Sequence, residues 1–225
     1  MIPKLHVVTD DEILARPDFE IRAREVCEVL ETREPVGDAV DDMMALHIRG
    51  GRTTGRKLTR LARILREPTT TSGVVLLVND RLDVALAVGA AGVHLGARSV
   101  PPLEARRLLG LTRLVGVSVH NVREAVEAAE AGADYLFVGT LFETPSHAGA
   151  AKGAEFMGVV ASRVDLPLIG IGGVTPDRGP AVLAAGGHGV AAIRGIWDAP
   201  SPPDAVLAYL DAMKVSDPGT PSHLR

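Results

Sequence analysis

The stretch Leu168-Ile-Gly-Ile-Gly-Gly-Val-Thr-Pro-Asp177 decides the fold class. It begins with a short apolar run, which is typical of a buried strand, and continues with two glycines that allow a tight turn. Pro176 follows at a position that suits the first turn of a helix. The stretch therefore predicts a strand, a short loop and a helix in direct succession.

The same succession recurs along the whole chain. Apolar runs predict strands at Leu5–Val8, Ala45–Ile48, Val74–Val78, Gly92–Leu95, Leu114–Ser118, Tyr135–Val138, Leu168–Ile171 and Gly189–Ile193. Amphipathic stretches predict helices at Phe19–Leu30, Gly55–Leu65, Arg81–Val88, Pro102–Leu109, Val122–Ala131, Glu155–Ser162, Pro176–Ala185 and Pro203–Met213. Strands that are separated by helices pair in parallel, because a parallel neighbour needs a crossover connection.

Eight such units predict a single closed (β/α)₈ barrel, a TIM barrel of the α/β class. The alternative is an open doubly wound sheet, but the Gly-x-Gly-x-x-Gly motif that usually follows its first strand is absent here. We predict one barrel domain over residues 1–213 and a disordered tail over residues 214–225, which is rich in Pro, Gly, Ser and Thr. The polar stretch Glu31–Asp42 predicts a loop.

Composition and charge exclude several classes of protein. Aromatic residues make up 3% of the chain and the formal net charge is −4, so neither base stacking nor a basic surface favours nucleic-acid binding. The single cysteine, Cys27, lies in a predicted helix, where we expect it to be buried. No apolar run approaches the roughly 20 residues of a membrane span, and the amino-terminus lacks a signal-peptide pattern. We predict a cytoplasmic protein without nucleic-acid or membrane partners, and leave open whether it is a homo-oligomer.

The loops that follow the strands build the active site of a TIM barrel. After the seventh predicted strand, Gly172 and Gly173 can bring backbone N–H groups close to a phosphate, and the next helix start favours an anion. After the eighth, Ile193 and Arg194 are placed to complete this nest, with the Arg194 side chain adding positive charge. The alternative is a pair of glycines that only form a tight turn. We predict phosphate binding here.

Polar side chains at the ends of other strands are candidates for contact with the substrate. Ser118 and His120 are two residues apart, so they point to the same side of the fifth strand, at the barrel mouth. A histidine there can take up and return protons near neutral pH, although a loop histidine that only bonds its neighbours is the alternative. His47 and Arg49 share one face of the second strand, either as contacts or as an inward polar pair.

Other polar residues have weaker assignments. Glu143 and Thr144 lie in a long loop after the sixth strand, and its glycine- and alanine-rich continuation suits a mobile lid. Asp80 can either bind Mg²⁺ or cap a helix, and capping is the commoner role. His6 and His94 lie inside predicted strands, where we assign them a structural role.

Taken in order, these motifs resemble those of the thiamine phosphate synthase superfamily, over nearly the whole chain from about Leu5 to Ile196. The matching segments are Leu5-His-Val-Val-Thr-Asp10, His47-Ile-Arg49, Asn79-Asp-Arg81, Gly92-Val-His-Leu-Gly96, Gly116-Val-Ser-Val-His120, Ala133-Asp-Tyr135, Gly139-Thr-Leu-Phe-Glu-Thr144 and Ile169-Gly-Ile-Gly-Gly173. Synthases of this superfamily join a pyrimidine diphosphate to a thiazole phosphate with Mg²⁺. Thiazole tautomerases move a proton so that a carboxylated thiazole phosphate becomes aromatic.

Three departures from the synthase pattern distinguish the two branches. The motif Gln-x-Arg-x-Lys is replaced by His47-Ile-Arg-Gly-Gly51, the second Mg²⁺ aspartate by Ser99, and Thr-x-Thr-Lys by Thr144-Pro-Ser-His147. These changes remove a metal carboxylate and two lysines, which leaves Mg²⁺ and a diphosphate with few partners.

The resemblance therefore implies a thiazole tautomerase-like isomerase of thiamine biosynthesis, with His120 as its catalytic histidine and with no metal or cofactor. The implied substrate and phosphate contacts are Arg49, Ser118, Thr144, Gly172, Gly173, Ile193 and Arg194. Whether Asp10, Glu143 or His47 assists His120 stays open. The alternatives are thiamine phosphate synthase itself and a non-catalytic barrel that binds a phosphorylated ligand.

Overall fold

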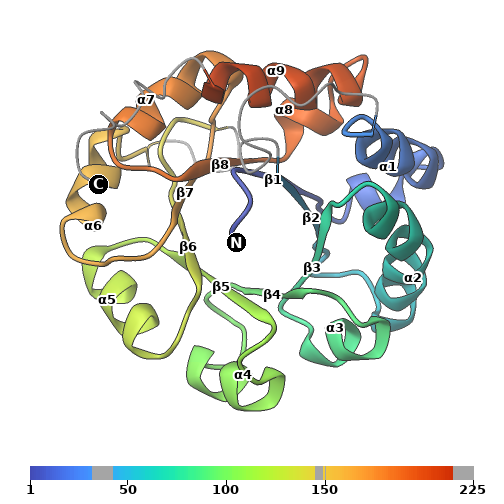
Figure 1. Cartoon of the computed structure of the whole chain (residues 1–225), viewed down its shortest axis with the longest axis horizontal. Coiled ribbons are helices and arrows are strands. Elements are labelled where there is room, and N and C mark those ends of the chain that lie inside the picture. The colour runs from blue at the N-terminus through green and yellow to red at the C-terminus, as the bar shows by residue number, and fades with distance from the viewer. Residues whose placement is uncertain (32–42, 145–148, 150, 215–225) are drawn as a thin grey trace, which may run out of the picture.

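The computed structural model of the chain describes residues 1–31, 43–144, 149 and 151–214. Its strands are β1 (Leu5–Val8), β2 (Met44–Ile48), β3 (Val75–Asn79), β4 (Gly92–Leu95), β5 (Leu114–Val119), β6 (Tyr135–Val138), β7 (Leu168–Ile171) and β8 (Gly189–Ala192). Each strand pairs in parallel with the next, and β8 pairs with β1 to close the sheet. The predicted TIM barrel is confirmed (Figure 1).

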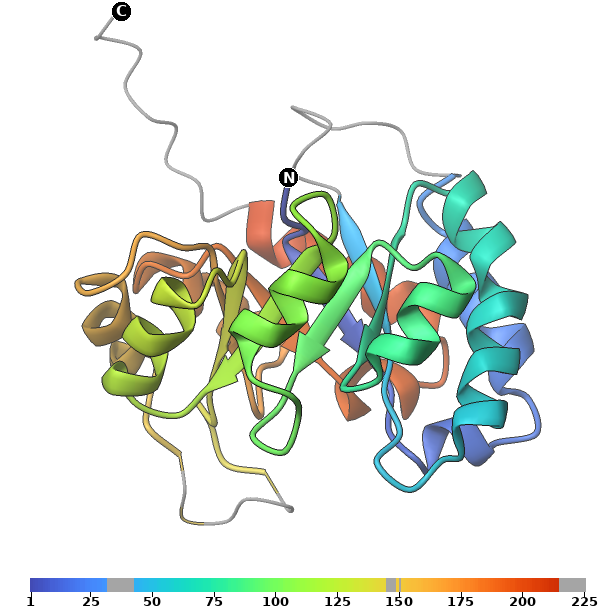
Figure 2. The same ribbon diagram turned by 90° about the horizontal axis from the view of Figure 1, so that it is seen from below.

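Helices cover the outside of the barrel. They are α1 (Phe19–Glu28), α2 (Gly55–Thr71), α3 (Leu82–Val88), α4 (Pro102–Leu109), α5 (Val122–Glu130), α6 (Glu155–Ala161), α7 (Gly179–Ala184), α8 (Arg194–Trp197) and α9 (Pro202–Lys214), with 3₁₀ turns η1 (Ile13–Ala15) and η2 (Pro176–Arg178). In Figure 2 the strands run downward between these helices, so that their carboxyl ends and the loops that follow them lie at the lower end. The predicted helices are confirmed within a few residues, except that α2 is longer and that η1 and α8 were not predicted.

The unpredicted length of α2 has a local cause. Pro68 lacks the N–H that would bond the carbonyl of Ile64, one turn earlier. That carbonyl instead lies 3.5 Å from Nη2 of Arg24 on α1. Near the helix end, hydroxyl groups donate to carbonyls four residues earlier, as Thr69 Oγ1 does to Leu65 O at 2.8 Å. A neighbouring helix and a run of threonines thus supply partners for these carbonyls, and the helix continues.

Alternate strand residues form two separate apolar layers. The layer between strands and helices includes Val7, Leu46, Val78, Val93, Val115, Leu136 and Val190. The layer around the barrel axis consists of Val8, Ala45, Leu77, Tyr135, Phe137, Ile169 and Ala191. The barrel is therefore filled by side chains, and a ligand has to bind above the inner layer, at one end.

Several predictions concern the chain apart from its barrel. Cys27 is buried in α1 as predicted, and burial raises the pKa of its thiol to about 12. Among the described residues, every helix is too short or too polar to span a lipid bilayer. Lys214 ends α9, and the rest of the predicted tail lies outside the described residues, as do residues 32–42 of the predicted loop.

Candidate active site

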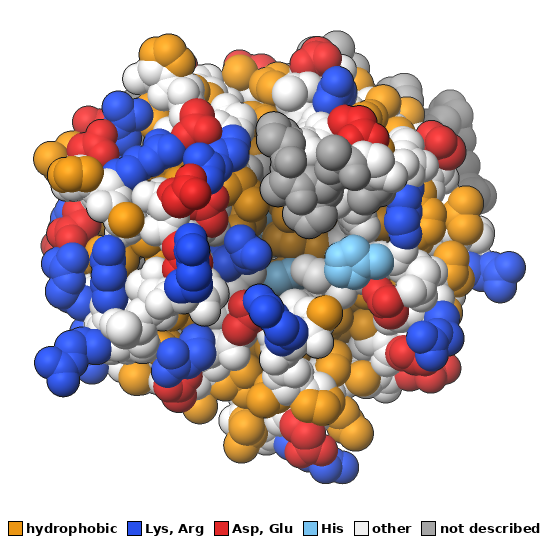
Figure 3. All heavy atoms as spheres, turned by 180° about the vertical axis from the view of Figure 1, so that it is seen from behind, with side chains coloured by type: hydrophobic (Ala, Val, Ile, Leu, Met, Phe, Trp, Pro, Cys, Tyr) orange, Lys and Arg blue, Asp and Glu red, His pale blue; other side chains and the backbone are white. Residues whose placement is uncertain are grey.

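The mouth of the barrel collects the predicted site residues at one end of the molecule. Because all eight strands are parallel, their carboxyl ends surround a single opening. Figure 3 shows this end hollowed at its centre, with a histidine side chain at the edge and many Lys and Arg side chains to one side. The predicted residues at these strand ends are Arg49, Ser118, His120, Thr144, Gly172, Gly173, Ile193 and Arg194.

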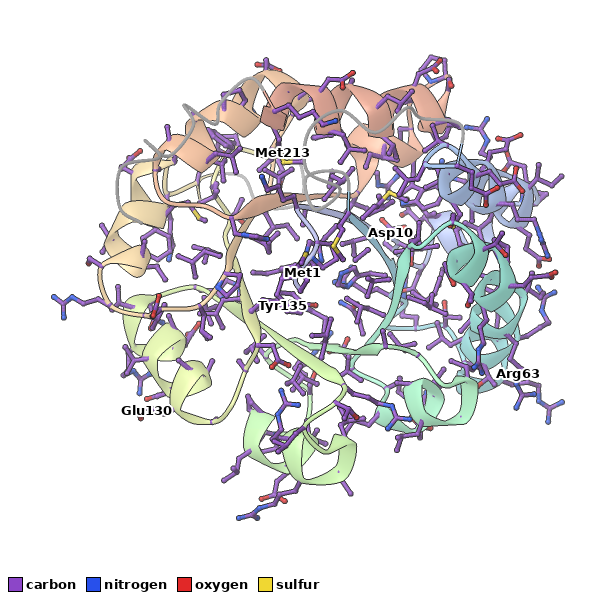
Figure 4. All side chains as sticks on the ribbon, viewed as in Figure 1. Met1, Asp10, Arg63, Glu130, Tyr135 and Met213 are labelled. Atoms are coloured by element: carbon purple, nitrogen blue, oxygen red, sulfur yellow. The ribbon has the colours of Figure 1, made fainter. Side chains whose placement is uncertain are left out.

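The floor of the mouth is a cluster of buried rings. His6, His47, His94, Tyr135 and Phe137 meet inside the barrel, with neighbouring ring centroids 3.9 to 5.7 Å apart. Figure 4 shows Tyr135 inside the barrel. Burial lowers the pKa of His47 to about 4, and the pKa values of His6 and His94 also lie well below the ordinary value for histidine. The three imidazoles are therefore neutral near pH 7 and put no charge beneath the mouth.

Ser118 is held from below by this cluster. Its Oγ lies 2.8 Å from Nε2 of His94, whose Nδ1 lies 3.2 Å from the Tyr135 hydroxyl. Gly116 makes this arrangement possible, because a Cβ there would lie 2.1 Å from the Tyr135 ring and 2.6 Å from His94 Nδ1. The hydroxyl of Ser118 is thus fixed at the border between the floor and the mouth.

His47 and Arg49, predicted to share one face of the second strand, differ in their burial. His47 is fully buried and hydrogen-bonds to His6 and Asn79, so it belongs to the floor. Arg49 is exposed, and its backbone N–H donates to Thr9 Oγ1 at 2.8 Å. Burial is the main cause of the low pKa of His94, and the positive charge of Arg49 is the smallest of its contributions.

No ion pair joins Arg49 to any other residue in the described parts of the chain. Arg52 follows in the same loop and is 83% exposed, with Asp11 at 3.6 Å from its Nε. Arg98, after β4, is also exposed. This side of the mouth therefore has positive charge that is available to an anionic ligand.

The turn after β7 has the backbone shape that the sequence predicts. Gly172 and Gly173 have φ values of 95° and 61°, in the left-handed region that favours glycine. A Cβ on Gly173 would lie 2.7 Å from the Glu143 carbonyl oxygen, so a larger residue does not fit beside this loop. Phe142 N–H donates to Gly172 O at 2.9 Å, and Arg178 Nη1 donates to Gly173 O at 2.7 Å. The turn is thus held closely against the loop that follows β6.

Arg194 begins α8 directly after Ile193, next to this turn in the barrel order. Its Nη2 lies 3.0 Å from Asp10 and 2.5 Å from Glu12, and its Nη1 lies 3.6 Å from Asp198. The hydrogen bond with Glu12 is the main cause that raises the pKa of Arg194. Its positive charge is shared among three carboxylates, so its contribution to phosphate binding stays a prediction.

His120 stands at the rim above the end of β5. Its side chain is 58% exposed, and its Nδ1 lies 3.4 Å from Glu124 Oε2. The same carboxylate accepts the His120 backbone N–H at 2.6 Å and the Asn121 side chain at 2.6 Å. Partial burial acts to raise the pKa of Glu124, but these bonds and His120 lower it overall. Glu124 is therefore a local partner of His120 that sequence reasoning missed, although its position three residues after Asn121 is typical of a capping box.

Lys152 is a second residue that the sequence did not reveal. Its Nζ contacts the His120 carbonyl oxygen and lies 4.4 Å from the centre of the Phe156 ring. Its backbone N–H donates to Thr140 O at 3.0 Å, which returns the loop after β6 to the mouth. In that loop Thr144 is described, whereas Ser146 and His147 lie outside the described residues.

A divalent metal site is the remaining possibility at the ends of β3 and β4. Asp80 Oδ1 accepts hydrogen bonds from Gly96 N–H, at 3.0 Å, and from the Ser99 hydroxyl. Within the described residues, no group of three or more His, Cys, Asp or Glu side chains could hold a metal ion. A hard cation prefers several anionic oxygens, and Ser99 provides a hydroxyl where a second carboxylate would be needed. These residues therefore do not fit a Mg²⁺ site built from two carboxylates.

Comparisons with known proteins connect this barrel to thiamine biosynthesis. A family model described as thiamine monophosphate synthase matches residues 18–196. The chain is 44% identical over 160 residues to the thiamine biosynthesis bifunctional protein ThiM/ThiE of Symbiobacterium thermophilum, over 70% of this chain and 33% of that protein. It is 40% identical over 189 residues to the thiamine-phosphate synthase of Haloarcula marismortui, over 81% of this chain and 90% of the relative.

A solved structure agrees with these sequence matches. Thiamine phosphate pyrophosphorylase from Pyrococcus furiosus superposes with a TM-score of 0.77 and 29% sequence identity, over 95% of this chain and 96% of that one.

These relatives contradict the predicted tautomerase function. Four relatives that are 40 to 43% identical are named thiamine-phosphate synthase. The isomerase prediction is therefore wrong, and the transferase alternative is better supported. The prediction relied on departures at His47, Ser99 and Thr144–His147, and these few positions cannot outweigh a similarity that extends over most of the chain.

Proposed function

The chain belongs to the thiamine monophosphate synthase family, and from that premise we propose that it is a thiamine-phosphate synthase. In this transfer the bond between the pyrimidine-bearing carbon and its diphosphate breaks, and the thiazole phosphate takes the place of the diphosphate. The observation that carries the proposal is the similarity of 40% over 90% of a relative that bears this name. The geometry of the mouth supports it with separate features for two anionic groups.

The side of the mouth at β7 and β8 suits the phosphate of the thiazole. Gly172 and Gly173 bring the backbone close to a ligand, and Ile193 precedes the start of α8. Backbone N–H groups at such a turn bind a compact anion without a long side chain. We assign Thr144 to the same subsite, because the loop after β6 packs directly on the glycine turn.

The side at β2 suits the diphosphate. Negative charge develops on this leaving group as its bond breaks, so a cation nearby stabilises the transition state more than the ground state. Arg49 has no ion-pair partner among the described residues, and its exposed side chain is available to an anion at this side of the mouth. Ser118, held by His94, and His120 at the rim are assigned to the pyrimidine and thiazole rings between the two anions.

The family resemblance implies Mg²⁺, but at the ends of β3 and β4 Asp80 has the Ser99 hydroxyl beside it where a second carboxylate would be needed. We therefore assign the charge of the diphosphate to arginine side chains and derive no step through a metal. Asp80 is the remaining carboxylate at the end of β3, and its Oδ1 is already bonded to Gly96 and Ser99.

A coupling assay tests the proposal. The purified full chain is incubated with the pyrimidine diphosphate and the thiazole phosphate, with Mg²⁺ in one series and with EDTA in another, and thiamine phosphate is measured by chromatography. We expect product in the Mg²⁺ series and a weaker dependence on Mg²⁺ than a synthase with two metal carboxylates shows. No product at micromolar enzyme in either series would contradict the proposed function.

A further inference from the structure

A column of buried polar side chains connects the bottom of the barrel to its mouth. His6 Nε2 lies 3.0 Å from the Pro3 carbonyl oxygen, and His6 Nδ1 lies 2.8 Å from His47 Nε2. His47 Nδ1 in turn lies 3.0 Å from Oδ1 of Asn79. Both histidines are 0% exposed and Asn79 is 7% exposed at the end of β3. The column therefore ends at the carboxyl end of β3, on the side of the mouth.

Counting protons shows that this column has two possible states. Two of the three hydrogen bonds join a ring nitrogen to an oxygen, Pro3 O or Asn79 Oδ1, and the third joins two ring nitrogens. Each bond needs one proton on a ring nitrogen, whereas two neutral imidazoles carry two protons in total. Either the histidine pair carries one extra proton, or the Asn79 side-chain amide is flipped by 180° so that its Nδ2 donates to His47 Nδ1.

The surroundings favour the neutral state. Besides burial, His47, His188 and the Pro3 carbonyl act on the pKa of His6, and Asn79 acts on the pKa of His47; none of these groups is a carboxylate. His94 is the next ring, and the one permanently charged side chain among the causes of its low pKa is Arg49, which is positive. A cation buried here would have no counter-ion, and that is costly in a low-dielectric interior.

We infer that His6 and His47 are positioning residues that keep the Asn79 amide turned with Nδ2 toward His47 and Oδ1 toward the mouth. His6 donates from Nε2 to Pro3, which leaves Nδ1 as an acceptor. His47 then donates from Nε2 to His6, which leaves its own Nδ1 as the acceptor for Asn79. The direction of all three bonds follows from one carbonyl group at the bottom of the barrel.

This polarity has a consequence for the ligand. A carbonyl oxygen that faces the mouth accepts hydrogen bonds, so the ligand group over Asn79 must be an N–H or O–H donor, such as an amino group on a heterocycle. A ring that presents only acceptors would meet a repulsive contact. This part of the inference rests on the proposed function, because it takes the pyrimidine diphosphate as the ligand.

The first test needs no ligand and no activity. Nitrogen NMR of the full chain labelled with ¹⁵N-histidine distinguishes protonated from unprotonated ring nitrogens near pH 7. We expect protonated Nε2 and unprotonated Nδ1 for both His6 and His47. A protonated Nδ1 on His47 would overturn the inference, whether or not the protein couples the two substrates.

The second test removes His6, the residue that sets the direction of the hydrogen bonds in the column. In His6→Phe the ring packing is kept, but His47 Nε2 loses its acceptor, so we expect part of the His47 population to become protonated at Nδ1. We expect the KM for the pyrimidine diphosphate to rise about 10-fold, with a smaller change in kcat, for the loss of one oriented hydrogen bond.

Two further variants separate positioning from simple loss of packing. His6→Gln keeps an amide N–H for Pro3 and an amide oxygen for His47, so it should restore both the His47 signal and the KM. Tyr135→Phe removes a buried hydroxyl that hydrogen-bonds to His94 and not to His6 or His47. It should leave the His47 nitrogen shifts unchanged. If His6→Phe keeps the wild-type His47 shifts and KM, the column does not orient Asn79.

Discussion

The two sides of the mouth treat positive charge in opposite ways. At β8, Arg194 is surrounded by Asp10, Glu12 and Asp198, and the neighbouring glycine turn offers backbone rather than charge. At β2, Arg49 has no ion pair within the described residues. A compact phosphate monoester suits the first side, because backbone N–H groups fix its position. A leaving diphosphate suits the second, because an arginine without an ion-pair partner can stabilise the negative charge that develops on the diphosphate in the transition state.

The loop after β1 lies between these two sides and makes contacts with both. Asp10 turns toward β8 and bonds Arg194, whereas its neighbour Asp11 turns toward β2. Asp11 accepts the backbone N–H groups of Arg52 and Thr53, and the Thr53 hydroxyl at 2.7 Å. Adjacent carboxylates therefore neutralise one side and shape the backbone of the other.

The largest expected effect comes from filling the glycine turn. Gly173→Val places side-chain atoms where the carbonyl of Glu143 and the side chain of Phe142 now lie, less than 3 Å from the new Cβ. We expect kcat/KM to fall by about 10²-fold, mainly through the KM for the thiazole phosphate, because the anchoring turn moves.

Gly110→Ala is the matched control for Gly173→Val. Its φ is also positive, at 71°, but nothing lies within 4 Å of the added Cβ. With ψ at −166°, this backbone conformation is one that only glycine adopts readily, so Gly110→Ala should lower stability by roughly 1–3 kcal/mol in urea denaturation and leave kcat/KM unchanged. If the Gly173→Val enzyme has the wild-type KM for the thiazole phosphate, the assignment of the phosphate to this side of the mouth is wrong.

Removing the free cation should have the next largest effect. Arg49→Ala takes away the unpaired charge on the β2 side, and we expect kcat/KM to fall about 30-fold, equivalent to roughly 2 kcal/mol. The loss should appear in kcat in steady-state assays, because the interaction strengthens as the diphosphate leaves. Arg49→Lys keeps the charge without the planar fork and should recover part of the activity. Equal kcat in Arg49→Ala and wild type would exclude this arginine from the charge stabilisation.

Removing the neutralised cation should matter less. Arg194→Ala leaves Asp10, Glu12 and Asp198 without their shared partner, but these side chains are partly exposed and their ion pairs are screened. We expect a change in kcat/KM of no more than about threefold and a loss of stability below about 1 kcal/mol. A larger loss of activity than in Arg49→Ala would reverse the comparison between the two sides.

The smallest effect on activity is expected for the anchor of the β2 side. Partial burial acts to raise the pKa of Asp11, but the bonds from Thr53 and Arg52 lower it overall. A carboxyl group with a lowered folded-state pKa stabilises the protein above its unfolded value of about 3.9 and loses that contribution as the pH falls. Asp11→Asn should therefore cost about 1 kcal/mol at pH 7, and its difference from wild type in denaturation midpoint should shrink below about pH 4. A constant difference across that range would assign the loss to shape rather than to charge.

Much of the fold could be predicted because its signals are local. Strands β4, β6 and β7 begin and end where the apolar runs do, and each run is followed directly by a glycine. The end of α2 could not be predicted, because the partner of the Ile64 carbonyl is Arg24, on another helix. The short α8 follows β8 without a polar stretch that would separate them in the sequence.

The candidate site was predicted less well than the barrel. Strand ends placed Ser118, His120 and Gly173 at one mouth, since parallel topology alone brings them there. The ion pairs of Arg194 depend on Asp10, 184 residues earlier in the chain, and only the closure of β8 on β1 reveals them. The family was predicted from motif order, whereas the choice of branch depended on a few substitutions and was wrong.

Strand direction also determines where the chain can be extended. Met1 is 76% exposed and lies ahead of β1, at the end of the barrel opposite the mouth, as Figures 1 and 2 show. Helix α9 runs back from the mouth side, so the described chain ends at Lys214 on that same far face. An affinity tag or a second enzyme fused at Met1 should therefore leave substrate entry unobstructed, and one of the relatives is itself a bifunctional protein.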